Sequence, residues 1–389
     1  MAALRLRSPE FFIFFSIWMI FQFNGLIDGA LIGRSGVPSW LIMLVFLVAI
    51  LFFDGRRTLA FDKYSFLFFV LFVSCLPSFL EFYNFYSLSV FSIVICIFIS
   101  SSMRKGWVLS SGEKQVVFNV SIIVALLSIL MFLYFVFIDR PVFGQDLIRP
   151  GYGYAIDRGV LLRLVGFADD PNFYVLAMIF PLLLMFSEKK IKYRKVGGII
   201  ILASLLLTFS RSGLIAVVVG ILAFYIKKVS FRMLAWAAVS LVLSLLISAL
   251  YGFVVSELKT NEDVVVERSF SSGFDSRNNL LSLALMKEDF SAFGNGIGRA
   301  KDIIGIHSHN SYFDYIFDSG YVPFSILAII LLFFFTDLYR RPSIFSAYAA
   351  SIVVGAAALS IPFQPMLILM IMCSHRYGTA SSQGGGNGV

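Results

Sequence analysis

Long apolar runs separated by short polar segments recur along the chain from Phe11 almost to the C-terminus. Each run is long enough to cross a hydrocarbon core of about 30 Å as a helix, and no interval between runs could hold a soluble domain of ordinary size. The pattern predicts an all-α integral membrane protein with about 12 transmembrane helices. We expect residues 1–373 to form one polytopic domain and the Gly-rich residues 374–389 to form a flexible cytoplasmic tail.

Short clusters of Lys and Arg set the expected orientation, because such clusters favour the cytoplasmic side of a membrane. Arg5 and Arg7 place the N-terminus inside. Every second predicted helix then returns to the inside and ends at a basic cluster; these helices lie at about 38–53, 87–102, 173–187, 213–226 and 312–335. Both termini are therefore expected in the cytoplasm.

Because successive helices cross the membrane in alternating directions, the same orientation places two long segments, residues 139–172 and 253–310, on the outer side of the membrane. No other segment has room for extramembrane structure. In the second, residues 274–290 have the helical period of an amphipathic helix on the outer leaflet, although an ordinary packed loop helix has the same pattern. Candidate chemistry is therefore sought in and around these two segments.

The composition agrees with a membrane protein, because 59% of the residues are hydrophobic and 14% are charged, against about a quarter charged in soluble domains. The formal net charge of +8 lies in clusters between apolar runs, so we assign it to membrane orientation and expect no nucleic-acid partner. Cys75, Cys96 and Cys373 lie in apolar segments at unrelated spacing, which indicates neither disulfides nor a metal site.

A polar turn, Thr208 to Gly213, interrupts a long apolar stretch at the expected outer interface. It contains Ser210 and Arg211. A guanidinium flanked by hydroxyls suits phosphate oxygens, which it binds through paired, charge-assisted hydrogen bonds. The alternative is an arginine that reaches the lipid headgroups.

The first outer segment ends in a second polar element that contains Arg163, Asp170, Pro171 and Asn172. Asp170 and Pro171 are typical of a helix start, and a helix N-terminus favours an anion. Capping would explain Asp170, Pro171 and Asn172. It does not explain Arg163, for which we expect a ligand-facing role.

The second outer segment ends with His307, His309 and Asn310. A histidine near its ordinary pKa can accept the proton of a sugar hydroxyl at neutral pH. A structural histidine is the alternative, and zinc is disfavoured because no third ligand stands at a suitable spacing. Residues 294–298, which contain three glycines, are expected to form a flexible turn, since no strand precedes them as in a dinucleotide-binding loop.

Taken together, the elements of the second half of the chain resemble the bacterial O-antigen polymerase and O-antigen ligase superfamily, which are polytopic glycosyltransferases. The resemblance lies in residues that recur in a fixed order: Arg163 with Gly166 and Pro171-Asn172; Leu207 to Gly213; Ser272-Gly273 with Arg277; residues 294–298; and His309-Asn310. Gly320 follows at the place where the ligases have a glycine, whereas Pro323 stands where they have a second one.

The resemblance implies a glycan linked to undecaprenyl diphosphate as substrate, at the periplasmic face of a bacterial inner membrane, without metal or other cofactor. It implies that His309 and Arg211 are catalytic. The residues it implies for substrate binding are Arg163, Arg277, Asn310, Ser210, Asn172 and His307. Membrane lipids are further expected partners, as is a chain-length-regulating co-polymerase.

Polymerisation of lipid-linked repeat units is the leading functional expectation. A ligase that moves the finished glycan to lipid A-core or another acceptor uses the same donor chemistry and stays open. A transporter or flippase of lipid-linked sugars would place ionisable residues inside the spans, where this sequence has few. A scaffold without catalysis would leave the Arg and His residues unexplained.

Overall fold

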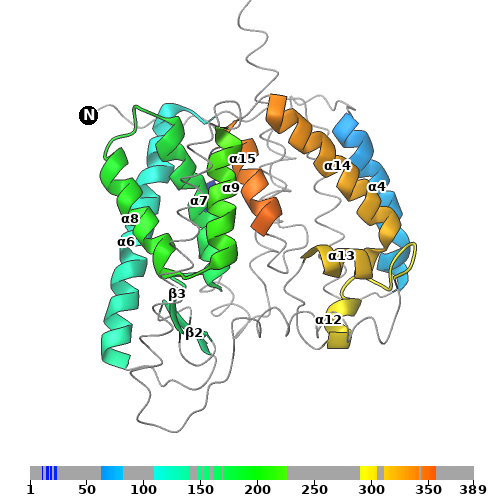
Figure 1. The fold of residues 1–389 in the computed structure, drawn as a ribbon, viewed down its shortest axis with the longest axis horizontal. Coiled ribbons are helices and arrows are strands. Elements are labelled where there is room, and N and C mark those ends of the chain that lie inside the picture. Colours follow the sequence, from blue (N-terminus) through cyan, green and yellow to red (C-terminus); the bar gives the residue numbers. More distant parts are fainter. Residues whose placement is uncertain are drawn as a thin grey trace, which may run out of the picture. The chain divides into compact units, whose positions relative to one another are not determined.

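The computed structural model describes residues 11, 15–16, 18–19, 22–23, 63–81, 109–139, 147–149, 153–157, 161–168, 170–225, 290–304, 311–340 and 343–355. This part of the chain is mostly helical (Figure 1). The chain divides into two compact units. Unit 1 comprises Met1–Phe46, Val108–Val264 and Pro342–Gly355, and unit 2 comprises Leu47–Trp107, Val265–Arg341 and Ala356–Val389. The expectation of one polytopic domain over residues 1–373 stays a prediction.

Three helices in the described part are long and apolar enough to cross a membrane: α4 (Lys63–Glu81), α6 (Ser111–Asp139) and α14 (Tyr321–Arg340). Shorter apolar helices accompany them: α7 (Pro171–Ser187), α9 (Arg211–Phe224) and α15 (Ile344–Gly355). Large apolar side chains such as Leu80, Phe137 and Leu332 are 73%, 76% and 67% exposed. Exposed apolar surface of this extent suits lipid contact, and the chain has the features of a helical membrane protein.

Two predicted helices are confirmed to within two residues at each end. The helix expected at 173–187 is α7, and that expected at 213–226 is α9. Segments 38–53, 87–102 and 374–389 lie outside the described residues, as does the predicted helix 274–290 except for its last residue.

Helix α7 is the centre of unit 1 and packs against α6, α8 (Arg194–Leu207), α9 and α15. Its residues from Tyr174 to Leu184 are buried on every side, because the sequence is apolar all round the helix. Small residues let the neighbouring backbones approach closely. A Cβ atom at Gly213 of α9 would lie 2.8 Å from the Val175 side chain of α7, closer than packed carbon atoms allow.

A small antiparallel sheet lies between α6 and α7, where the sequence predicts only an outer loop. Its strands are β1 (Leu147–Arg149), β2 (Tyr154–Asp157) and β3 (Leu161–Leu164), in the order β1-β2-β3. Tyr154 pairs with Leu164, and both side chains are fully buried. The all-α prediction is wrong for this segment, because strands this short form by packing against α6 and α8 rather than by a local sequence pattern.

The two ends of unit 1 carry different polar contacts. At one end, Lys114 at the start of α6 forms a salt bridge with Glu188, the C-cap of α7. At the opposite end, the Arg163 Nε atom of β3 donates a hydrogen bond to the Thr208 carbonyl oxygen, just after α8. Within unit 1, the described part of segment 139–172 and the polar turn after α8 therefore lie at one end, and their predicted position outside the membrane stays a prediction (Figure 1).

Unit 2 is built on α4 and α14, which pack side by side. Lys63 and Tyr64, at the start of α4, both contact the Asp337 carboxylate near the end of α14, at 2.9 and 2.6 Å. Near the end of α4, Ser78 donates a hydrogen bond to the carbonyl oxygen of Asp318, just before α14. The two helices therefore run in opposite directions.

The helix predicted at 312–335 is wrong as a single element. It is two helices, α13 (Ser311–Ser319) and α14, separated at Gly320. Gly320 has a φ of +93°, which a helix cannot contain, and its backbone lies against Gly294, so that a Cβ atom there would lie 2.3 Å from the Gly294 nitrogen. Pro323 then occupies the first turn of α14, where a missing N–H costs little.

Candidate functional site

Local capping builds the turn between α8 and α9. Ser210 is the N-cap of α9, and its hydroxyl accepts a hydrogen bond from the Gly213 N–H at 2.9 Å. Thr208 closes the end of α8 through a hydroxyl that donates to the Leu205 carbonyl at 2.6 Å. Phe209, between them, is left-handed with a φ of 46°. The chain can therefore reverse within three residues and begin α9 directly at Arg211.

The start of α7 is capped in a similar way. Asp170 is the N-cap, and one of its carboxylate oxygens accepts the Asn172 backbone N–H at 2.7 Å and the Asn172 side-chain amide at 2.6 Å. Pro171 occupies the first helical position, as predicted. This cap orients the Asn172 carboxamide so that its oxygen points away from Asp170.

Asn172 joins the two helix starts. Its side-chain oxygen accepts hydrogen bonds from the hydroxyls of Ser210 and Ser212, the latter at 3.1 Å. The N-termini of α7 and α9 are thereby held side by side. The capping pattern of either helix alone does not predict this contact. The positive ends of both helix dipoles lie at the same place.

Two arginines lie at this end of unit 1. Arg163 projects from β3, and its bond from Nε to the Thr208 carbonyl at 2.9 Å fixes the guanidinium against the turn. Arg211 is the first residue of α9, three positions beyond Thr208. Both arginines are half-buried. We use the name cationic end for the group formed by Arg163, Arg211, Asn172 and the two helix N-termini.

Arg211 is placed against the ordinary electrostatic preference of a helix. A cation in the first turn opposes the helix dipole at a cost of about 0.3 to 1 kcal/mol, whereas an anion there is favoured. The N-terminus of α7 lies nearby but already carries the Asp170 carboxylate as its cap, and Arg163 adds a second guanidinium. An anion bound at the cationic end would interact favourably with both guanidinium groups and with the start of α9.

The structure thus brings together four residues predicted from the sequence: Arg163, Asn172, Ser210 and Arg211. Ser210 is almost fully buried, and its hydroxyl and the Asn172 carboxamide are engaged in the internal bonds above. Ser210 and Asn172 therefore hold the two helix starts together. Direct contact of these two residues with substrate stays a prediction.

The remaining predicted site residues lie outside the described part of the chain. They are Arg277, His307, His309 and Asn310. Their predicted roles in base catalysis and substrate binding therefore stay predictions.

In unit 2, the predicted flexible turn at residues 294–298 is instead a loop fixed by hydrogen bonds. The Asn295 and Gly296 N–H groups donate to the carbonyls of Phe317 and Asp318, at 3.2 and 3.1 Å. Positive φ angles at Gly294, Gly296 and Gly298 let the backbone follow the end of α13 this closely. The expectation of flexibility overlooked these contacts, because they come from a helix that follows later in the sequence.

Asp318 is a buried residue that the sequence did not single out. Its two carboxylate oxygens accept the Gly298 and Ala300 N–H groups, each at 2.8 Å, and so cap α12 (Arg299–Ile304). Burial raises the pKa of Asp318 to about 8; the two N–H donors oppose this shift and the charge of Asp314 adds to it. An acidic residue directly before Ser319-Gly320, at the end of an amphipathic helix, is the only local signal for this role.

No family model, curated protein or solved structure matches the chain. What the fold defines is a mostly helical chain with helices suited to a membrane. Function is therefore inferred from the geometry of the cationic end and from the order of the polar elements in the sequence.

Proposed function

We propose that this protein polymerises lipid-linked oligosaccharide repeat units into O-antigen or a related surface polysaccharide. It would act at the periplasmic face of a bacterial inner membrane, as a glycosyltransferase whose donor is a glycan on undecaprenyl diphosphate. The observation that carries the proposal is the cationic end of unit 1, where two helix N-termini and two arginines meet.

The cationic end suits the leaving group of this reaction. The acceptor hydroxyl oxygen attacks the anomeric carbon of the donor sugar, the bond from that carbon to the diphosphate oxygen breaks, and the diphosphate leaves with the electron pair. Arg211 and Arg163 bind the developing charge, together with the positive end of the α9 dipole. Positioned charge of this kind is commonly the largest contribution to catalysis, and it needs no metal.

The other half of the reaction needs a base near the acceptor. The family resemblance assigns this role to His309, which takes the proton of the acceptor hydroxyl as the new glycosidic bond forms. Arg277, His307 and Asn310 belong to the same proposal as substrate-binding residues. Asn172 and Ser210 act in it mainly by holding the two helix starts in register.

The full topology is part of the proposal. About 12 transmembrane helices would place both termini in the cytoplasm and segments 139–172 and 253–310 in the periplasm. The support is that the basic residues 189–195 lie at the end of unit 1 opposite the cationic end. A chain-length-regulating co-polymerase would then meet the enzyme on its periplasmic side.

A ligase that transfers the finished glycan to lipid A-core or another acceptor is the nearest alternative, because its donor and leaving group are the same. Pro323 does not separate the two functions, since its place in the first turn of α14 has a structural reason. A lipid-linked sugar transporter would need the cationic end for binding only, without bond cleavage.

Complementation of a strain that lacks this protein separates these functions. Arg211→Ala and Arg163→Gln variants, with Arg340→Ala as an exposed control in α14, are compared at equal membrane expression by gel analysis of the surface glycan. A polymerase defect leaves single repeat units on the acceptor. Polymer that accumulates on the lipid carrier indicates a ligase, and repeat units trapped in the cytoplasmic leaflet indicate a transporter. A normal ladder from both site variants would reject the cationic end as the site.

A further inference from the structure

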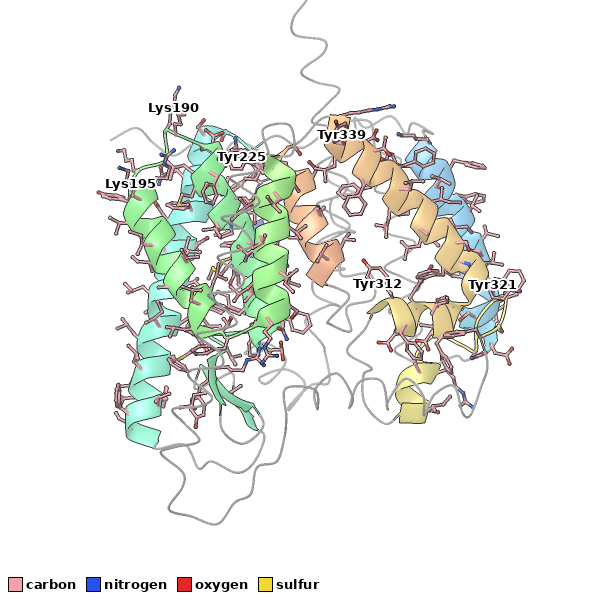
Figure 2. The ribbon with its side chains drawn as sticks, viewed as in Figure 1. Lys190, Lys195, Tyr225, Tyr312, Tyr321 and Tyr339 are labelled. Carbon is pink, nitrogen blue, oxygen red and sulfur yellow. The ribbon has the colours of Figure 1, made fainter. Side chains whose placement is uncertain are left out.

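The loop between α7 and α8, together with the first two residues of α8, carries a dense group of cations. Five basic residues lie within seven positions: Lys189, Lys190, Lys192, Arg194 and Lys195. The four lysines are exposed, and no acidic residue lies among them. Figure 2 shows Lys190 and Lys195 pointing away from unit 1, at the end where α9 stops near Tyr225. Membrane orientation needs only a few such charges and no particular arrangement of them.

This loop has a built structure. The Gln115 side chain of α6 accepts the Lys192 backbone N–H at 2.7 Å and donates to the Lys192 carbonyl at 3.5 Å. Ile191 is buried beneath the loop, and Tyr193 is left-handed with a φ of 58°. The loop is therefore held against α6 by its backbone, which leaves the lysine side chains directed outward.

The nearest acidic side chain does not reduce the charge of this loop. Glu188 forms a salt bridge with Lys114 of α6, and both side chains are largely buried. The charges of Glu188 and Lys114 cancel, so that the loop beyond them keeps its full positive charge.

An exposed apolar stripe on α8 leads directly to the loop. Val196 and Ile199 are 62% and 68% exposed, and Leu202 and Leu206 continue the same face along the helix. The opposite face of α8 packs against α6 and α7. Tyr193, exposed at the boundary between the stripe and the lysines, has the amphipathic character typical of the membrane interface. The cations therefore lie where lipid-facing surface ends and headgroups begin.

We propose that residues 189–195, held by Gln115 and continuous with the exposed stripe of α8, form a binding site for an anionic phospholipid. The acyl chains lie along Val196 and Ile199, and the lysine ammonium groups bind the phosphate. This site is at the end of unit 1 opposite the cationic end, so it is independent of the proposed glycosyl transfer.

The test uses the full-length protein purified in an uncharged detergent. Native mass spectrometry measures the binding of phosphatidylglycerol and of phosphatidylcholine to wild type and to Lys189→Gln/Lys190→Gln. A matched control, Lys227→Gln/Lys228→Gln, removes another adjacent lysine pair that follows an apolar stretch. We expect wild type and the control pair to prefer phosphatidylglycerol. The 189/190 pair should bind it at least about tenfold more weakly, because each lysine near an anionic surface contributes roughly fivefold.

A Gln115→Ala variant tests whether lipid binding needs the conformation of the loop or only its positive charge, because it removes the hydrogen bonds to the Lys192 backbone and changes no charge. We expect it to weaken phosphatidylglycerol binding while leaving the melting temperature without lipid unchanged. Equal binding to wild type and both loop variants would overturn the proposal, as would equal binding of the two lipids. Displacement of the lipid by millimolar inorganic phosphate would overturn it too, by showing a site for free anions.

Discussion

Replacement of Asp318 by alanine tests the packing of unit 2 most sharply. The carboxylate accepts the Gly298 and Ala300 N–H groups at 2.8 Å each, across 20 and 18 positions of sequence. Alanine would leave both donors unpaired in a buried site, which costs about 1 to 3 kcal/mol for each. We therefore expect the opening free energy of α12 to fall by about 3 kcal/mol, which raises amide exchange roughly a hundredfold.

Hydrogen–deuterium exchange of the peptide over residues 296–304 measures this effect in the purified full-length protein. Asp302→Ala is the matched control, because Asp302 is on the same helix but its side chain is 57% exposed and forms a surface salt bridge with Arg299. It should change exchange by less than about threefold. Equal exchange in the Asp318→Ala variant and wild type would refute the argument that this carboxylate holds α12.

Three further predictions concern Asp318, Gly320 and Ser210. Burial raises the pKa of Asp318 from 3.8 to about 8, so between these pH values the folded protein binds a proton that the unfolded chain has lost. The protection of the α12 amides against hydrogen exchange should therefore fall as the pH rises from 3.8 to about 8. In Asp318→Asn this protection should not depend on pH over the same range. Gly320→Ala, which forces a Cβ atom to 2.3 Å from a backbone nitrogen, should lower the melting temperature, whereas Gly112→Ala, with nothing within 4 Å, should not. Ser210→Ala should cost about 1 kcal/mol in chemical unfolding through loss of the α9 cap, and Ser212→Ala less.

The parts of the fold that the sequence predicts well are those with local causes. The start of α7 follows from Asp170 and Pro171, because a cap and a restricted backbone act within one turn. For α9 the sequence predicts the helix from its apolar run, and the structure adds Ser210 as its cap. The three-stranded sheet could not be predicted in this way. Its strands have three or four residues and are stabilised by α6, which precedes them, and by α8, which follows later in the sequence.

For the candidate site, too, contacts between residues distant in sequence could not be predicted. The alternating direction of the predicted helices places Arg163 and Arg211 on the same side of the membrane, and within unit 1 the two residues lie at one end. It could not predict that Asn172 bridges the two helix starts, because that contact joins residues 38 and 40 positions apart. The capping role of Asp318 could not be predicted for the same reason, since it depends on a loop that precedes this residue by about 20 positions.

The central claim is that the cationic end binds the diphosphate of a polyprenyl carrier, and direct binding tests it most closely. Native mass spectrometry of the purified full-length protein would compare undecaprenyl diphosphate with undecaprenyl monophosphate in wild type, Arg211→Ala and the exposed control Arg340→Ala. We predict that wild type and the control prefer the diphosphate and that Arg211→Ala binds it at least about tenfold more weakly, as expected for the loss of a charge-assisted pair. Equal affinity in all three proteins would contradict the account.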